Sequence, residues 1–181
     1  MTRPTLYLDF DGPLHPAAVY STPWGPELRM GDWSLFGKTA DACAPRLFMH
    51  TPHLEAALAR YARDIDVVLS TSWAWQLGYE AALERLPASI SGMCRGATWE
   101  PECEALAVAT WRRQSRYEQI RAHARRHRIV HWLALDDDND CWPEAEYDKL
   151  ILCDGRDGLG APETRAALAS GLHLLTSRDV L

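Results

Sequence analysis

The chain has 181 residues, of which 47% are hydrophobic and 24% charged, and its formal net charge is -6. These values are typical of a single soluble domain with a substantial core, and the chain is too short for two ordinary domains. The negative charge argues against broad electrostatic attraction to nucleic-acid phosphates, and no apolar run reaches the roughly 20 residues that a membrane-spanning helix needs.

The amino-terminal segment and the cysteines indicate a cytoplasmic protein. Residues 1–8 lack the apolar core and small-residue cleavage site of a secretory signal peptide. The five cysteines are odd in number and form no C-x-x-C pair; they are Cys43, Cys94, Cys103, Cys141 and Cys153. A disulfide framework or a cysteine zinc site is therefore not expected, and a reducing compartment is favoured.

The first half of the chain alternates apolar runs with helical patterns. Thr5–Phe10 predicts a buried strand, and residues 13–50, rich in Pro, Gly and Trp, indicate a long insertion with a small hairpin around Met30–Phe36. A helix is predicted to begin near Thr51, which can cap it, and the β-branched run Ile65–Leu69 predicts a second buried strand.

The second half continues this alternation. The predicted elements are, in chain order, a helix over Tyr79–Leu86, a short strand over Ser89–Met93, a helix opened by the capping box Ser115–Glu118, strands over Ile129–Leu135 and Lys149–Cys153, and a helix from Pro162 to near Gly171. Continuous apolar strands separated by helices are typical of a parallel sheet with helices on both faces. We therefore predict an α/β three-layer sandwich that forms one domain over residues 1–181.

Acidic and hydroxyl side chains follow the predicted strands. Asp9 and Asp11 end the first strand, Ser70-Thr-Ser72 follow the second, and Asp136-Asp137 follow the strand after the capped helix. Parallel strands bring such ends to one edge of the sheet, where clustered carboxylates would repel one another unless a cation neutralised them. Since Mg²⁺ prefers oxygen ligands, we predict a magnesium site at this edge.

The spacing of Asp9 and Asp11 suits phosphoryl transfer. Side chains two residues apart on a strand point the same way, so that one carboxylate can attack phosphorus while the other handles the leaving-group proton. Gly12 allows a sharp turn and a close approach of the substrate to the backbone.

A transferring phosphoryl group also needs hydrogen-bond donors and a fixed positive charge. Thr71 is the first candidate for the hydroxyl donor, with Ser70 and Ser72 as alternatives. Arg116, at the start of the capped helix, is the candidate cation, although Arg112 and Arg113 lie close by in the sequence.

Four segments resemble, in order, the four motifs of the haloacid-dehalogenase (HAD) superfamily: Leu6–Gly12, Val67–Ser72, Arg116 and Leu133–Asp137. More narrowly, the chain is similar to the small HAD-like domains of Swiss Army Knife RNA-repair proteins. The segments that carry this likeness are Asp9–Pro16, Thr71–Trp73, Arg116–Ile120 and Trp132–Asp138.

This resemblance implies a HAD-like Rossmannoid sheet of five parallel strands in the order 5-4-1-2-3, without a large cap domain. It implies a magnesium-dependent phosphohydrolase in which Asp9 is the nucleophile and Asp11 the general acid/base. The Asp9 side chain, the Asp11 backbone carbonyl and an acid of the fourth motif would bind Mg²⁺. Asp137 is preferred to Asp136 for this last position, with Asp140 as third choice. The implied substrate is a phosphorylated small molecule, such as a nucleotide, or a nucleic-acid end.

Two departures from the family pattern leave a second interpretation open: Pro13 stands where Thr or Val is common, and Arg116 where Lys is more common. Arginine binds phosphate bidentately but cannot donate a proton. A third departure, Ala74 where the narrower group often has Arg, concerns a substrate contact normally made at that position. The motif order excludes a phosphoacceptor receiver domain, and the alternative is a binding module that kept the fold and lost turnover.

Three histidines recur every four residues, at His123, His127 and His131. We expect them to be surface residues, because no fourth metal ligand accompanies them and the predicted helix ends near Arg128.

Overall fold

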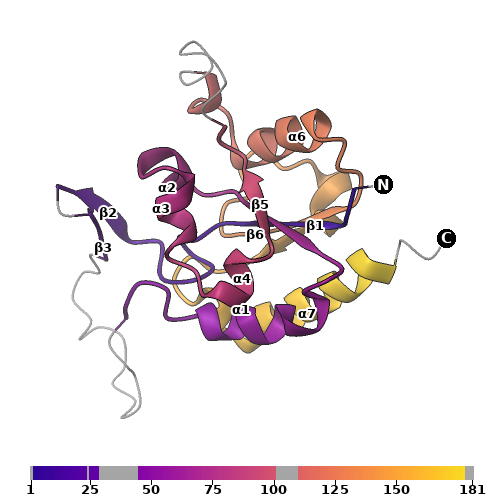
Figure 1. The fold of residues 1–181 in the computed structure, drawn as a ribbon, viewed down its shortest axis with the longest axis horizontal. Helices are drawn as coiled ribbons and strands as arrows, with labels where there is room; N and C mark the ends of the chain where they lie inside the picture. Colours follow the sequence, from indigo (N-terminus) through magenta and orange to yellow (C-terminus); the bar gives the residue numbers. More distant parts are fainter. Residues whose placement is uncertain (1, 24, 29–44, 101–109, 178–181) are drawn as a thin grey trace.

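Five parallel strands form one sheet, in the order β5-β4-β1-β6-β7 (Figure 1). The computed structural model describes residues 2–23, 25–28, 45–100 and 110–177. The sheet strands are β1 (Thr5–Leu8), β4 (Asp66–Leu69), β5 (Cys94–Ala97), β6 (Trp132–Asp136) and β7 (Leu150–Leu152). The labels differ from the predicted order 5-4-1-2-3 because they also count β2 and β3, which lie outside this sheet. When only the strands of this sheet are counted along the chain, β1, β4, β5, β6 and β7 are strands 1 to 5. The order β7-β6-β1-β4-β5 then reads 5-4-1-2-3.

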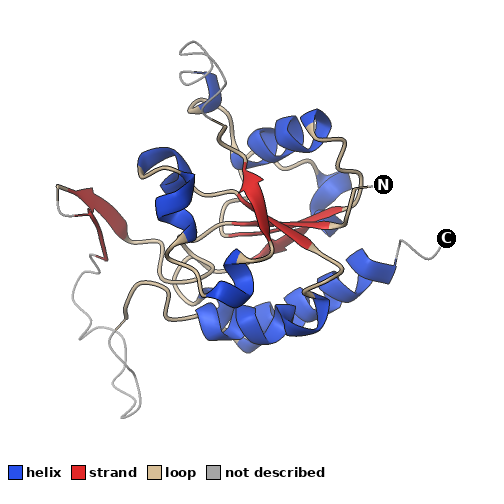
Figure 2. Ribbon diagram, viewed as in Figure 1, coloured by secondary structure: helices blue, strands red, loops and turns tan. Residues whose placement is uncertain are grey.

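Helices lie on both sides of the sheet (Figure 2). Among the described residues, α1 (Thr51–Leu58), α4 (Ala88–Ser91) and α7 (Pro162–Ser177) cover one side, and α6 (Arg116–Arg126) covers the other. The alternation of side chains along β1 explains the two cores: Leu6 and Leu8 pack in the larger core with α1 and α7, whereas Tyr7 packs with Ile120 of α6. No helix in the described part of the chain is both long and apolar enough to cross a membrane.

The remaining elements are short. They are the antiparallel hairpin β2 (Val19–Thr22) and β3 (Gly25–Leu28), helices α2 (Ser72–Gln76) and α3 (Tyr79–Leu83), and the 3₁₀ turns η2 (Ala59–Tyr61), η3 (Glu144–Lys149) and η4 (Gly158–Gly160). The hairpin predicted around Met30–Phe36 lies outside the described residues. The hairpin β2–β3 precedes it and was not predicted.

Two predicted elements are wrong. The strand predicted over Ser89–Met93 is mostly helix α4, because the N–H groups of Ile90 and Ser91 both donate to the carbonyl of Pro87, and the strand begins only at Cys94. The last helix does not end near Gly171. A Cβ on this glycine would lie 2.9 Å from Cδ2 of Leu133, so Gly171 allows the helix to pack closely on the sheet.

Candidate active site

The ends of β1 and β6 bring two carboxylates together. Leu8 pairs with Leu135, so the following residues, Asp9 and Asp136, lie side by side where the strands end. Both continue the alternation that points Tyr7 toward α6, so their carboxylates face that helix. Their side chains are only 4% and 1% exposed.

Asp137 completes a cluster of three carboxylates. One oxygen from each of Asp9, Asp136 and Asp137 lies within 4.8 Å of the others. The Asp137 side chain lies against two glycines: a Cβ on Gly12 would be 2.4 Å from its Cγ, and one on Gly155 would be 2.5 Å from its Oδ2. Gly12 also has a φ of +90°, so both the turn and the space require glycine there.

Arg116 contacts two of these carboxylates. Its Nη2 lies 3.5 Å from Oδ1 of Asp9, and its Nε lies 3.1 Å from Oδ2 of Asp136. Arg116 is the first residue of α6, whose start is fixed by the capping box of Ser115 and Glu118. Of the other two arginines, Arg112 lies 4.7 Å from the ring centroid of Trp75, and Arg113 is exposed.

Burial makes the ionised form of these acids costly. It raises the pKa of Asp9 well above its ordinary value; Arg116 opposes this rise, and the neighbouring carboxylates add to it. Burial also raises the pKa of Asp136 to about 7 and the pKa of Asp137 above its ordinary value. Oδ1 of Asp9 and Oδ2 of Asp136 are buried, and the contact recorded for each of them is the ion pair with Arg116. A cluster of three carboxylates with one guanidinium keeps an excess of negative charge, and its all-oxygen donor set fits a hard divalent cation.

Asp11 is held by two donors, Trp73 and His15, that were not predicted to contact it. The indole Nε1–H of Trp73 donates to Oδ1 at 2.9 Å, and Nε2 of His15 lies 3.0 Å from the same oxygen. The N–H of Phe48 donates to Nδ1 of His15, which places the imidazole proton on Nε2, toward Asp11. Two features of the sequence could have indicated these contacts: His15 lies four residues after Asp11, and Trp73 directly follows the hydroxyl motif.

The three hydroxyl residues occupy different positions. Ser70 is fully buried on the sheet face of Asp9, because Leu8 pairs with Leu69, and its Oγ has no hydrogen-bond partner in the described part of the chain. Thr71 caps α2 and accepts the N–H of Trp73 at 3.4 Å. Ser72 is partly exposed.

A pocket of about 280 Å³ opens beside Arg116. Its lining includes Ser72, Trp75, Trp111, Arg112, Arg116 and Asp138. It therefore joins two indoles and two guanidinium groups to the edge of the carboxylate cluster.

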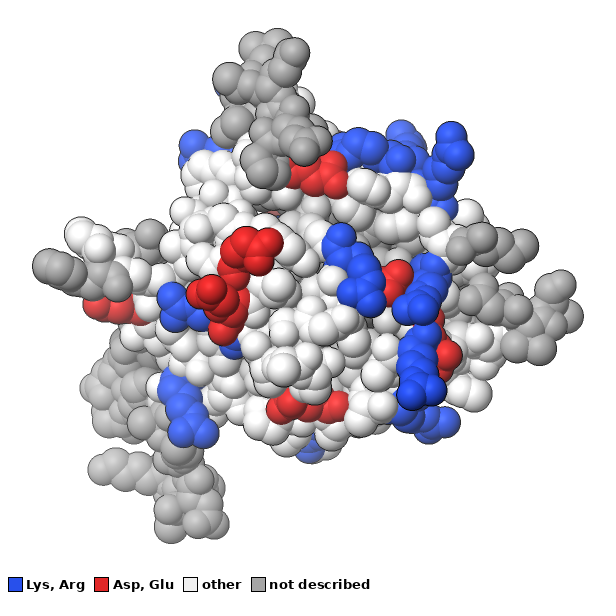
Figure 3. Space-filling model, viewed as in Figure 1, with Lys and Arg blue, Asp and Glu red and all other residues white. Residues whose placement is uncertain are grey.

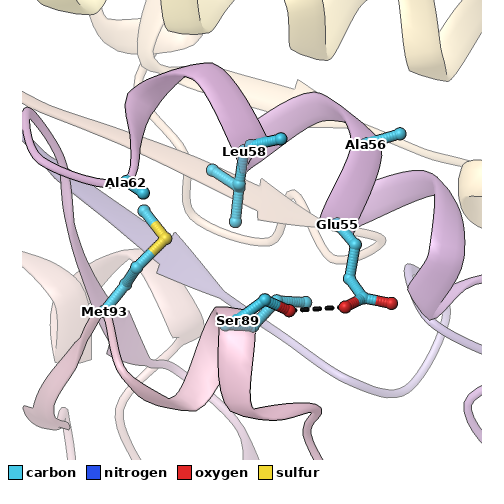
Figure 4. A pocket seen from close by; sticks show the side chains of 8 residues that line it. Glu55, Ala56, Leu58, Ala62, Ser89 and Met93 are labelled. Carbon is cyan, nitrogen blue, oxygen red and sulfur yellow. Dashed lines mark hydrogen bonds between the residues drawn. The ribbon is translucent and has the colours of Figure 1, made fainter.

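A larger groove of about 560 Å³ lies between α1 and α4 (Figure 4). Leu58, Ala62 and Met93 give it a largely apolar lining, and Ser89 hydrogen-bonds to Glu55 across it. Ala62 precedes β4 and Met93 precedes β5, so this groove lies toward the amino ends of the strands, away from Asp9.

The loop after β7 supports the turn after β1. The N–H of Leu159 donates to the carbonyl of Pro13 at 3.0 Å, so Pro13, an atypical residue at this motif, contributes an acceptor and needs no N–H.

Asp140, the third-choice metal ligand, is exposed and lies outside the three-carboxylate cluster.

Comparison with known proteins agrees with the motifs. The family model described as "HAD domain in Swiss Army Knife RNA repair proteins" matches residues 5–164, a range that contains the carboxylate cluster and Arg116. No curated protein and no solved structure matches the chain. As its motifs predicted, the chain belongs to the family of HAD domains in Swiss Army Knife RNA repair proteins.

Proposed function

We propose that this protein is a magnesium-dependent phosphohydrolase that acts through an aspartyl-phosphate on Asp9. The observation that carries this proposal is the meeting of Asp9, Asp136 and Asp137 within 4.8 Å, with Arg116 against two of them. Membership of the HAD family supports it, because HAD domains are generally hydrolases.

The three carboxylates, together with the backbone carbonyl of Asp11, would hold Mg²⁺. When bound, the ion would neutralise the cluster and the charge of the phosphoryl oxygens. Of the two acids left open by the sequence, Asp137 is the less buried and is not in contact with Arg116 through the ion pairs described above. It therefore stays our preferred ligand from the fourth motif, with Asp136 shared between Arg116 and the ion.

The proposed reaction has two steps. A carboxylate oxygen of Asp9 attacks phosphorus, the bond from phosphorus to the leaving oxygen breaks, and Asp11 gives its proton to that oxygen. Asp11 then takes a proton from water, whose oxygen attacks the same phosphorus, so that phosphate leaves and Asp9 is regenerated. Trp73 and His15 both bind Oδ1 of Asp11, which leaves Oδ2 to carry the proton.

Five further residues would bind the phosphoryl group or balance its charge. Thr71 accepts a hydrogen bond from Trp73, so its own O–H is left to donate to the substrate. Ser70, Ser72 and the backbone at Gly12 are the other proposed contacts. Arg116 would supply the fixed positive charge.

We propose a phosphorylated nucleic-acid end as the substrate, with a phosphorylated small molecule as the alternative. The name of the family, which refers to RNA repair, supports this choice, as does the pocket that contains Trp75 and Trp111. Stacking of a base on an aromatic ring contributes about 1–3 kcal/mol. Since the net charge of -6 opposes broad attraction, recognition would depend on this local pocket.

A phosphatase assay with RNA oligonucleotides phosphorylated at the 5′ or the 3′ end, nucleotides and p-nitrophenyl phosphate tests this function. We expect turnover by the parent protein that requires Mg²⁺ and that Asp9→Asn lowers by at least about a thousandfold. Asp140→Asn, an exposed acid of the same loop as Asp137, is the matched control and should retain activity. Turnover that survives Asp9→Asn would contradict the mechanism. Binding of phosphorylated RNA without any turnover would favour the inactive binding module.

A further inference from the structure

A second group of metal-ligand side chains lies at the carboxyl end of α6. Glu100, His123 and His127 each offer one ligand atom, and these atoms lie within 4.8 Å of one another. His127 is the residue that caps the carboxyl end of α6, and its N–H donates to the carbonyl of His123 one turn earlier. The two side chains therefore lie on one face, and their rings stack with centroids 4.3 Å apart. Glu100 comes from the segment that follows β5.

His123 is buried, which corrects the prediction that it is a surface residue. Its face of α6 packs on β1, where Nδ1 of His123 lies 2.9 Å from the hydroxyl of Tyr7. Because Nδ1 is engaged there, Nε2 is the nitrogen that faces Oε1 of Glu100. A histidine fixed through one ring nitrogen by an oxygen, with the other nitrogen turned to further ligands, is the usual arrangement of an imidazole metal ligand.

The contact between His123 and Glu100 is not an ordinary ion pair. Nε2 of His123 and Oε1 of Glu100 are 3.7 Å apart, which is too long for a hydrogen bond. Two ligands of a tetrahedral Zn²⁺, each bound at about 2.0–2.1 Å, would lie roughly 3.3–3.5 Å apart.

The other two side chains are also oriented for a shared ion. Arg126 binds Oε2 of Glu100 at 2.8 Å, which leaves Oε1 to the imidazoles. Figure 3 shows that Lys and Arg side chains gather over the region of α6. Nε2 of His127 lies 2.5 Å from Oε1, so the ion would require its ring to move outward by about 1 Å. The His127 side chain is 45% exposed, which leaves room for this movement.

We propose that Glu100, His123 and His127 form a binding site for Zn²⁺ or a similar transition metal, with water as the fourth ligand. Imidazole nitrogen favours such ions, whereas the all-oxygen cluster around Asp9 favours Mg²⁺, so the two sites select different metals. The ion would join the segment after β5 to α6 and thereby to Tyr7 on the central strand.

Calorimetric titration with Zn²⁺ tests the proposal, using the full chain without a polyhistidine tag, freed of metal by a chelator and held in excess Mg²⁺. We expect the parent to bind one equivalent, and His127→Ala to weaken binding by more than tenfold. Tyr7→Phe should weaken it by about 10–100-fold, as loss of the group that orients a ligand does. His173→Ala, an exposed histidine on α7, is the matched control and should bind like the parent.

Asp137→Asn separates this site from the acidic cluster. We expect this variant to keep its Zn²⁺ equivalent, and loss of the equivalent would show that zinc had entered the acidic site, which would overturn the proposal. Absence of Zn²⁺ uptake by the parent, or uptake by His127→Ala equal to that of the parent, would overturn it as well. Circular dichroism of each variant checks that the fold is retained.

Discussion

Gly12 and Asp137 lie so close that no side chain fits between them: a Cβ on Gly12 would be 2.4 Å from Cγ of Asp137. Gly12 belongs to the turn after β1, and Asp137 follows β6. The contact therefore joins the two strand ends that carry Asp9 and Asp136, and the third carboxylate takes its position because the first motif has a glycine there.

Gly12→Ala tests this contact. The substitution introduces strain at a φ of +90° and a clash with Asp137, so it should lower both the stability and the affinity for Mg²⁺. Gly78→Ala is the matched control, because Gly78 has a φ of +91° and nothing lies within 4 Å of a Cβ there. In denaturant unfolding we expect Gly12→Ala to lose about 1–3 kcal/mol more than Gly78→Ala. Equal losses of unfolding free energy would mean that the Asp137 side chain moves aside at little cost.

Arg116→Met removes the positive charge from two buried carboxylates. At pH 8 in a chelator, this should cost about 3–5 kcal/mol of unfolding free energy, because uncompensated buried charge is expensive. Added Mg²⁺ should restore part of the loss, while phosphatase activity stays low. Arg113→Met, at an exposed arginine three residues earlier, should behave like the parent in both measurements. If instead Arg113→Met lost stability and activity while Arg116→Met behaved like the parent, Arg113 would be the basic residue of the third motif.

Asp136→Asn tests the pH dependence of stability. The folded pKa of Asp136, about 7, lies above the value of about 4 for an unfolded aspartate, so the folded protein holds this proton more tightly. In a chelator, the parent should therefore lose stability relative to the variant as pH rises from about 4 to about 7. Asp136 also raises the pKa of Asp9, so its removal changes the stability of the variant in the same direction. His123, with its lowered pKa, has the opposite effect in this range but is present in both proteins, so it cancels in the difference. If the difference in urea unfolding free energy between the parent and the variant did not change with pH, the prediction would be contradicted.

Trp73→Phe keeps an aromatic ring but removes the N–H that holds Asp11. Loss of a hydrogen bond to a charged group should lower kcat by about tenfold or more, with a smaller effect on KM. Trp142→Phe is the control, because the indole of Trp142 donates to the carbonyl of Glu146 at the same distance of 2.9 Å, away from the site. Steady-state kinetics with a small aryl phosphate provide the measurement. Equal effects of the two substitutions would remove Trp73 from the catalytic machinery.

Trp75→Ala tests the pocket as a site for the substrate base. We expect KM for a phosphorylated RNA end to rise about tenfold, which matches the loss of one stacked base. The KM for p-nitrophenyl phosphate should not change, and this small substrate serves as the internal control. A similar rise for both substrates would indicate damage to the carboxylate site itself.

Much of the candidate site was predictable because its residues lie at the ends of strands and at the start of a helix, which local sequence patterns identify. The apolar runs before Asp9 and Asp136 identified two buried strands, and the capping box placed Arg116 at a helix start. Strand alternation then explains why all three side chains meet on the α6 face of the sheet.

The rest depends on packing that one segment cannot encode. The hydrogen bond from Trp73 to Asp11 joins residues 62 positions apart, and the burial of His123 depends on Tyr7, 116 positions away. Gly171 resembles a helix end in the sequence, but α7 continues through it and packs closely on the sheet at this position. In these cases, contacts between distant segments determine the position of a side chain or the end of a helix, and the local sequence does not specify them.

The pairing of β1 with β6 has a consequence for how the protein assembles. Leu8 pairs with Leu135, and Asp9 and Asp136 are the next residues of the two chains, so a slip of one residue would send leucines to the wrong core and separate the acids. Under the proposed function, the site for the divalent ion would form only once these two strands, 127 residues apart in register, have paired. During refolding, ion uptake would therefore report completion of the most distant pairing made by the central strand.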